Sequence, residues 1–273
     1  MSEARTPTEA GIDTPVDAWE PWRRTTPARI GLGRVGDAAP TAELLGFGWA
    51  HASARDAIHV QPDLDALERA LRSQGWNPLR VKSRAADRTT YLRRPDLGRL
   101  LDEEDGAKLQ PVPGGCDVCL VVGDGLSALA IERHAAPLLA ALKPLVPPSW
   151  RIGPLAIASQ ARVALADDIG ERLGARLSVM LIGERPGLSS PDSLGIYLTF
   201  GPRRGRTDAQ RNCISNIRPQ GLPPAAAAAR LAWLMRESLA RALSGVELKD
   251  ESDDAALAAQ SSAPLPPKQQ GDT

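Results

Sequence analysis

Three short apolar runs separated by two helical patterns constrain the fold of this chain more than any other feature. The runs are VCLVV (118–122), PLAIA (154–158) and LSVMLI (177–182), and each has the length of one buried strand. The residues between them, 126–143 and 163–173, have the apolar spacing of helices. The helices return the chain across the sheet, so successive strands must be parallel. The sequence therefore predicts an α/β fold with a Rossmann-like, mostly parallel sheet flanked by helices.

The remaining segments suggest a smaller unit before this sheet and a polar segment at each end. Residues 41–101 have helical apolar spacing, which predicts a small helical N-terminal domain. A fourth strand is expected at GIYLTF (195–200), and a last helix is expected to begin at Pro223 and Pro224 and to stop at Gly245. Four segments are thus expected: a flexible tail (1–27), the helical domain (28–110), the α/β domain (111–248) and a second flexible tail (249–273).

The ends of the predicted parallel strands indicate where a ligand would bind. Parallel sheets bind ligands beyond the carboxyl ends of their strands. Three loops leave those ends, at Gly123–Ser127, Ser159–Val163 and Gly183–Leu188, and together they predict one binding mouth. Glu184, in the third loop, is suited to accept hydrogen bonds from ligand amides or hydroxyls.

Composition excludes several classes of partner. The 33 basic and 33 acidic residues balance, so we expect no nucleic-acid partner. No apolar run approaches the roughly 18 to 20 residues of a membrane span, so no membrane contact is expected. The first residues, MSEARTPTEAGIDTP, lack the basic start and apolar core of a secretory signal, and the three cysteines suit a reducing compartment. We therefore expect a cytoplasmic protein.

Two motifs near the first predicted strand have familiar spacings in the wrong context. Cys116 and Cys119 have C-x-x-C spacing but lie in a strand, so we expect buried cysteines and no redox or metal site. GDGLS has neither the lysine of a P-loop nor the central serine of a nucleophile elbow. It is either a glycine turn in which Asp124 or Ser127 caps the next helix, or a loop that contacts a ligand, and both alternatives stay open.

Motifs outside the predicted mouth are less specific. GLGRVG (31–36) fits the dinucleotide fingerprint, but no strand precedes it and the next helix begins near Thr41, so we expect no nucleotide site. His51, Arg55 and His59 share a helix face, which we interpret as a polar interface stripe. His134 is expected at the surface.

A basic cluster follows the fourth predicted strand, and its role stays open between gripping a phosphate or an acidic partner and forming a solvated loop. No pair of acids, no nucleophile triad and no metal-ligand set is evident, so we predict no catalytic residue and no metal ligand in this chain. The pattern favours a binder of a large polar ligand. The cluster comprises Arg203, Arg204, Arg206, Arg211 and Arg218.

Four long stretches together resemble one family, the small subunits of ethanolamine ammonia-lyase. They are RIGLGRVGDAAPTAELLGFGWAHASARDAIHV, DVCLVVGDGLSALAIERHA, SQARVALADDIGERLGARLSVMLIGERPGLSSPDSLGIYLTFGP and RNCISNIRPQGL. The resemblance covers roughly 28–245 and is too long to arise by chance.

This resemblance implies an adenosylcobalamin-dependent lyase that converts ethanolamine to acetaldehyde and ammonia by a radical mechanism. A TIM-barrel large subunit would hold ethanolamine, with cobalamin between the two subunits and Val163, Glu184 and Cys213 contacting it. The D-x-H-x-x-G motif of cobalt-ligating folds is absent, so no residue of this chain is expected to ligate cobalt. In some members the N-terminal segment directs packaging into a bacterial microcompartment. The alternative is a non-catalytic adaptor of an ethanolamine-using complex.

Overall fold

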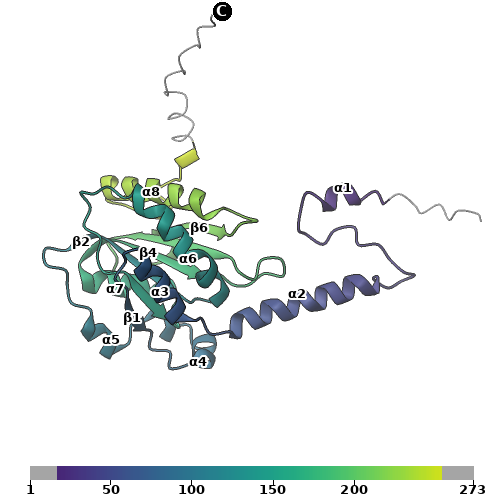
Figure 1. Cartoon of the computed structure of the whole chain (residues 1–273), viewed down its shortest axis with the longest axis horizontal. Coiled ribbons are helices and arrows are strands. Elements are labelled where there is room, and N and C mark those ends of the chain that lie inside the picture. Colours follow the sequence, from purple (N-terminus) through teal and green to yellow (C-terminus); the bar gives the residue numbers. More distant parts are fainter. Residues whose placement is uncertain (1–16, 254–273) are drawn as a thin grey trace, which may run out of the picture. The chain divides into compact units, whose positions relative to one another are not determined.

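The structure, a computed structural model, describes residues 17–253. A six-stranded mixed sheet forms the core of the larger of its two compact units (Figure 1). Its strand order is β1-β3-β2-β4-β5-β6; the first four strands in this order run parallel, and β5 and β6 are antiparallel to their neighbours. The mostly parallel α/β sheet predicted from the sequence is confirmed. The strands are β1 (Leu79–Lys82), β2 (Cys116–Gly123), β3 (Ala156–Ser159), β4 (Ala175–Gly183), β5 (Leu194–Phe200) and β6 (Arg211–Ile217).

Most of the helices begin at a short polar side chain that caps the first turn, or end at a residue in the left-handed conformation. Ser127 caps α6 by accepting a hydrogen bond from the amide of Ala130, and Gly174 ends α7 in the left-handed conformation. The last helix stops at Arg241, four residues before the expected Gly245, because Ala242 already adopts that conformation. The α-helices are α1 (Glu20–Arg23), α2 (Thr41–His59), α3 (Leu64–Ser73), α4 (Arg88–Arg93), α5 (Glu103–Lys108), α6 (Ala128–Leu142), α7 (Leu165–Leu173) and α8 (Pro224–Arg241).

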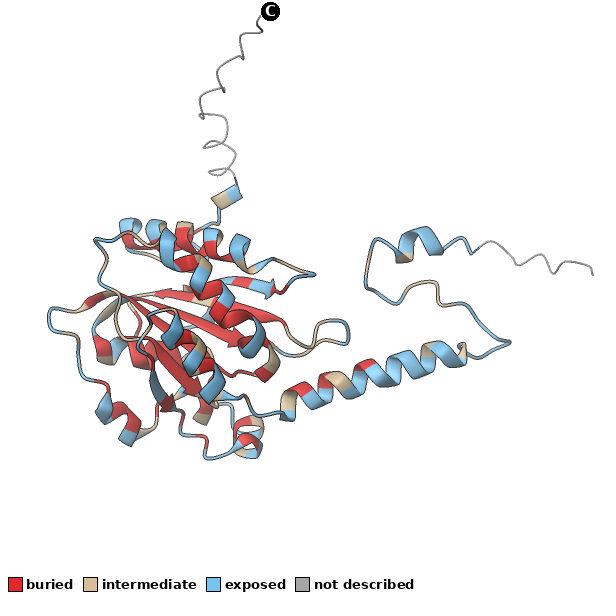
Figure 2. Cartoon of the chain, viewed as in Figure 1, coloured by how far each residue is buried: buried red, intermediate tan, exposed pale blue. Residues whose placement is uncertain are grey.

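The two faces of the sheet carry separate cores, and Figure 2 shows their buried residues along the strands and the inner faces of the helices. Alternate residues of β2 and β4 point to opposite faces. Val118 and Leu120 pack under α3, α6 and α8, whereas Cys119 and Val121 pack under α7. Since both faces are covered, the central strands are apolar throughout, which is why they stand out in the sequence.

The two edge strands are absent from the sequence predictions. β1 lies inside 41–101, which was expected to be helical, yet it pairs with β3 over its full length. β6 lies in the basic segment that was expected to be a loop. Edge strands expose one side to water, so LRVK and RNCISNI contain too few apolar residues to resemble buried strands.

The chain divides into two compact units after Ala50, within α2. In the first unit, the Arg23 guanidinium donates to the Gly31 carbonyl and pairs with Asp17. At the other end, Arg230 of α8 pairs with Asp250 and Asp253, so the described start of the expected C-terminal tail contacts the fold. The rest of both expected tails, 1–16 and 254–273, lies outside the described residues.

No helix within residues 17–253 has both the length and the apolar character needed to cross a membrane. The expectation that 28–110 form a domain that docks on a partner stays a prediction.

The buried ion pair between Arg211 of β6 and Asp167 of α7 provides a test of the fold. Both side chains are almost fully buried, and burial raises the pKa of Asp167 while Arg211 opposes the rise. Arg211→Met should lower the free energy of unfolding by about 3–5 kcal/mol in urea titrations, because it leaves a buried carboxylate unpaired.

The loss of unfolding free energy in Arg211→Met should be smaller at about pH 5 than at about pH 8. Burial raises the pKa of Asp167 in the folded state, so acid neutralises the carboxylate that the substitution leaves unpaired. Arg241→Met, which removes an exposed pair with Glu237, is the matched control and should cost less than about 1 kcal/mol. Equal costs for the two variants would contradict the prediction.

Candidate functional site

One cavity of about 400 Å³ lies at the carboxyl ends of the parallel strands. The three loops predicted to outline a mouth all contribute to it, so their convergence is confirmed, whereas the binding of a ligand there stays a prediction. Two further side chains, Tyr91 of α4 and Tyr197 of β5, complete its wall. The loop residues that line it are Gly125 and Leu126 after β2, Arg162 and Val163 after β3, and Gly183, Glu184 and Arg185 after β4.

Asp124 joins two of these loops. Its buried carboxylate accepts hydrogen bonds from the amides of Gln160 at 2.9 Å and Ala161 at 2.8 Å, and Arg88 Nη1 lies 3.7 Å from Asp124 Oδ2. Burial raises the pKa of Asp124, while these amide donors and Arg88 oppose the rise. The carboxylate is therefore a structural link between the β2 and β3 loops.

The glycine turn has the helix cap that the sequence offered as one alternative, whereas its contact with a ligand stays a prediction. Ser127 caps α6, and Gly125 lines the cavity. Gly125 has φ +57°, and a Cβ there would lie 2.2 Å from the Gly183 carbonyl oxygen. Only glycine allows the β2 and β4 loops to approach so closely.

Tyr91 and Arg162 form the side of the cavity next to the loop after β3. The Tyr91 hydroxyl donates to the Ala161 carbonyl at 2.9 Å, and the Arg162 guanidinium carbon lies 4.3 Å from the centre of the Tyr91 ring. Arg162 Nε is buried and has no hydrogen-bond partner among the described residues. Sequence reasoning missed Tyr91, because α4 reaches the mouth only through the tertiary fold.

Glu184 is half-buried and firmly held at the end of β4. Its amide donates to the Ser193 carbonyl at 2.9 Å. Its Oε2 accepts from the Ser193 hydroxyl and from the amide of Asn216 at 3.3 Å. Both of these donors engage Oε2, and no described residue donates a hydrogen bond to Glu184 Oε1.

Cys213 does not line the cavity itself, but it lies behind Tyr197, which does. It faces Tyr197 across the β5–β6 ladder, and its thiol contacts the Tyr197 hydroxyl. Burial is the main cause that raises the pKa of Tyr197, and the neighbouring Cys213 raises it further. The structure thus brings the three predicted site residues together: Val163 and Glu184 line the cavity, and Cys213 supports it through Tyr197. Their contact with a cofactor stays a prediction.

Other sequence expectations have mixed outcomes. Cys116 and Cys119 are buried in β2, as predicted, and burial raises the pKa of the Cys119 thiol. His134 was expected at the surface, but this is wrong. It is buried in α6 with Nε2 3.4 Å from Asp192 Oδ2, because the loop before β5 covers this helix. Within residues 17–253 no cluster of histidine, cysteine and acidic residues could hold a metal ion.

The arginine cluster mainly binds the chain itself. Arg211 pairs with Asp167, Arg204 pairs with Asp168 at 2.8 Å, and Arg218 donates to the Ser189 carbonyl at 3.1 Å. These contacts fasten the segment after β5 to α7 and to the loop between β4 and β5, and they leave most of the arginines unavailable to an anion.

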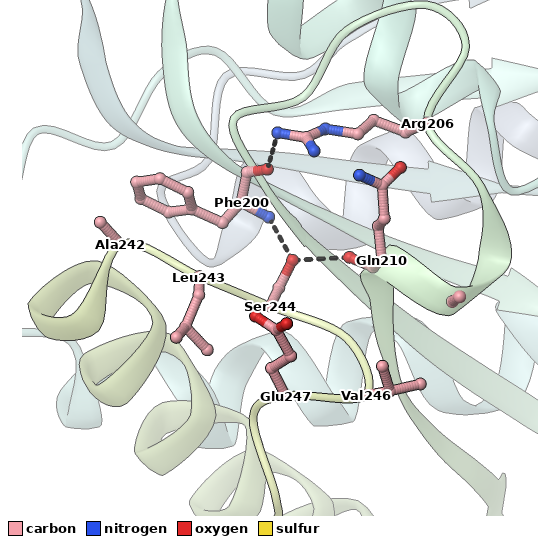
Figure 3. A pocket seen from close by; sticks show the side chains of 9 residues that line it. Phe200, Arg206, Gln210, Ala242, Leu243, Ser244, Val246 and Glu247 are labelled. Carbon is pink, nitrogen blue, oxygen red and sulfur yellow. Dashed lines mark hydrogen bonds between the residues drawn. The ribbon is translucent and has the colours of Figure 1, made fainter.

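A second cavity, of about 300 Å³, lies beside the end of β5 (Figure 3). Arg206 donates to the Phe200 carbonyl there. The Ser244 hydroxyl accepts from the Phe200 amide and donates to the Gln210 carbonyl. Phe200 pairs with Leu177 at the start of β4, so this cavity is at the opposite end of β4 from the mouth. It contains none of the predicted site residues.

Comparisons with known proteins agree on one family. The family model described as ethanolamine ammonia-lyase light chain matches residues 16–249. The ethanolamine ammonia-lyase small subunit of Azotobacter vinelandii is 55% identical over 251 residues, covering 90% of this chain and 93% of the relative. The small subunit of Ralstonia nicotianae is 53% identical over 258 residues, covering 93% and 95%. That of Pseudomonas putida strain W619 is 52% identical over 247 residues, covering 89% and 91%.

The burial of the cysteines predicts their order of reaction. Iodoacetamide should modify the exposed Cys213 in the folded chain and should reach Cys116 and Cys119 only in denaturant, because these two thiols are buried in β2. Burial also raises the pKa of Cys213, so its modification should accelerate as the pH increases. Peptide mass spectrometry checks both points, and native modification of Cys119 at the rate of Cys213 would contradict them.

Proposed function

Because this chain belongs to the family of ethanolamine ammonia-lyase small subunits, we propose that it forms one wall of an adenosylcobalamin site at the interface with the large subunit. One observation carries the proposal. The three residues that the family resemblance implies as cobalamin contacts are far apart in sequence, yet they gather around the cavity at the strand ends. The enzyme would be a carbon–nitrogen lyase that is active only when both subunits are present.

The chemistry of the cavity suits part of a corrinoid. Glu184 Oε1 offers an acceptor to side-chain amides or to a ribose hydroxyl. Val163 and Leu126 offer apolar contact, and Arg162 adds a cation. A cobalamin molecule is far larger than a cavity of about 400 Å³, so a second wall is required, which the large subunit would supply.

The residues that line the cavity support a binding role for this chain. When bound, the cofactor supplies the radical chemistry that converts ethanolamine to acetaldehyde and ammonia. This chain orients the cofactor through Glu184 and excludes water with the apolar residues around it. No histidine lines the cavity among the described residues, so we propose that no residue of this chain would ligate the cobalt of a bound cofactor.

The first part of α2 suits a protein partner. Leu45 and Trp49 are 70% and 78% exposed, although large apolar side chains gain most free energy when buried. Gly46 and Gly48 lower the intrinsic helix propensity between them, so packing against a partner would stabilise this segment. We propose that it docks on the large subunit, as part of the expected docking domain (28–110).

We also propose that the assembled enzyme acts in the cytoplasm. Any sequence that targets it to a bacterial microcompartment would lie within the N-terminal segment (1–27). Residues 1–16 of this segment lie outside the described part of the chain.

Reconstitution tests the whole proposal. The purified chain, mixed with the large subunit and adenosylcobalamin, should produce acetaldehyde when ethanolamine is added, and omission of any component should abolish production. Co-purification with the large subunit, without cobalamin binding and without activity, would favour the alternative of an assembly adaptor.

Removal of the Glu184 carboxylate tests the cofactor wall. Glu184→Ala should weaken cobalamin binding to the assembled enzyme by about 10- to 100-fold, because one charged acceptor is lost. Glu237→Ala, which removes a carboxylate on the exposed face of α8, is the control and should leave the affinity unchanged. Equilibrium titration followed by absorbance measures both, and wild-type affinity in Glu184→Ala would remove this role.

Introduction of a charge on α2 tests the docking face. Leu45→Glu should weaken association with the large subunit by about 10-fold or more, because the carboxylate would lose its hydration in the interface. Val246→Glu, at an apolar side chain that is 76% exposed, is the matched control. Sedimentation of mixed subunits measures association. The docking assignment fails if both variants assemble equally well.

A further inference from the structure

We propose that Ser193, directly before β5, and Gly195, its second residue, are positioning residues that hold the Glu184 carboxylate with one oxygen reserved for the ligand. This inference rests on the proposed cofactor site and adds to it the residues that decide how Glu184 is presented. Neither residue is among the lining residues of the cavity, so each would act only through Glu184.

Ser193 binds Glu184 twice. Its carbonyl accepts the Glu184 amide at 2.9 Å, which extends the β4–β5 ladder by one residue. Its hydroxyl donates to Glu184 Oε2. The backbone contact places the Glu184 Cα, and the hydroxyl contact then selects one orientation of the carboxylate. A side chain that is ordered before binding loses less conformational entropy when the ligand arrives.

A β-bulge supplies the second donor. The β5–β6 register shifts between Leu194 and Ile196, so that Leu194 faces Ile217 while Ile196 faces Ile214. The extra residue in β6 interrupts the ladder, and the Asn216 amide donates instead to Glu184 Oε2 at 3.3 Å. Bulges commonly redirect groups beside functional sites. Two donors therefore engage the same oxygen, and Oε1 receives none from the described residues.

Gly195 leaves the space that this orientation requires. A Cβ at this position would lie 2.7 Å from Glu184 Oε1 and 3.0 Å from its Cγ. Gly195 does not have a positive φ, so other residues could adopt its backbone conformation. Its requirement is steric: any larger side chain would displace the carboxylate.

The loop between β4 and β5 has other attachments, which separates a positioning role from a folding role. Ser127 Oγ donates to the Pro191 carbonyl at 2.7 Å, and Arg133 pairs with Asp192 at 2.8 Å. These contacts keep the loop in place when the Ser193 hydroxyl is removed. The expected consequence of Ser193→Ala is thus a mobile Glu184 carboxylate in an otherwise folded loop.

The test uses the assembled enzyme and cyanocobalamin, a form of the vitamin that binds without turnover. Ser193→Ala and Gly195→Ala should each weaken cyanocobalamin binding by about 5- to 10-fold. The KM for adenosylcobalamin should rise in parallel, with little change in kcat. Ser73→Ala, which removes an exposed hydroxyl that donates to the Ala70 carbonyl, is the control and should leave both values unchanged.

A double-mutant cycle with Glu184→Ala isolates the mechanism. If both residues act through the carboxylate, neither substitution should change cyanocobalamin affinity more than about 2-fold once Glu184 is absent. Thermal denaturation and co-purification with the large subunit establish that each variant folds. If Gly195→Ala fails to assemble, Ser193→Ala alone decides the inference.

Two results would overturn the inference. One is wild-type affinity in Ser193→Ala, and the other is a loss that persists undiminished in the Glu184→Ala background, which would indicate a general structural effect. Failure of the proposed function itself would be different: Glu184→Ala would then bind cyanocobalamin as tightly as the wild type.

Discussion

The buried carboxylate of Asp124 links the loops on which the candidate site depends. It binds the amides of Gln160 and Ala161 and lies beside Arg88, so the loop after β2 is fastened to the loop after β3. The Tyr91 hydroxyl fastens the second loop once more at Ala161. A buried carboxylate is stable only when donors surround it, so these contacts hold the two loops to each other. The loops that these contacts join both line the cavity at the end of the sheet.

The antiparallel strands add what the parallel part of the sheet lacks. β5 contributes Tyr197 to the cavity wall, and the residues at its start hold Glu184. β6 contributes Cys213 behind Tyr197 and the Asn216 amide at the bulge. A parallel sheet alone provides loops at one edge, whereas here two further strands form a side wall. This open, one-sided wall is consistent with a site that a second subunit completes.

Local sequence was sufficient where burial is nearly complete. β2 and β4 are covered on both faces, so their apolar runs predict strands directly. β1 and β6 were missed, because these edge strands contain more polar residues than the central strands. His134 was misplaced for a related reason: its burial comes from the loop at Asp192, which is distant in sequence. In each failure the missing information was the neighbour that covers the residue.

The sequence by itself determined the α/β class, the three loops at the strand ends and the place of Glu184 and Val163 in them, because strand order and connection rules already confine these residues to one edge. It also determined the family, through long matching stretches. Only the tertiary structure decided that Tyr91, Tyr197 and Ser193 join that edge. The contact between Tyr91 and Ala161, for example, spans 70 residues of sequence. Such contacts depend on how helices and edge strands pack, and they leave no periodic pattern in the sequence.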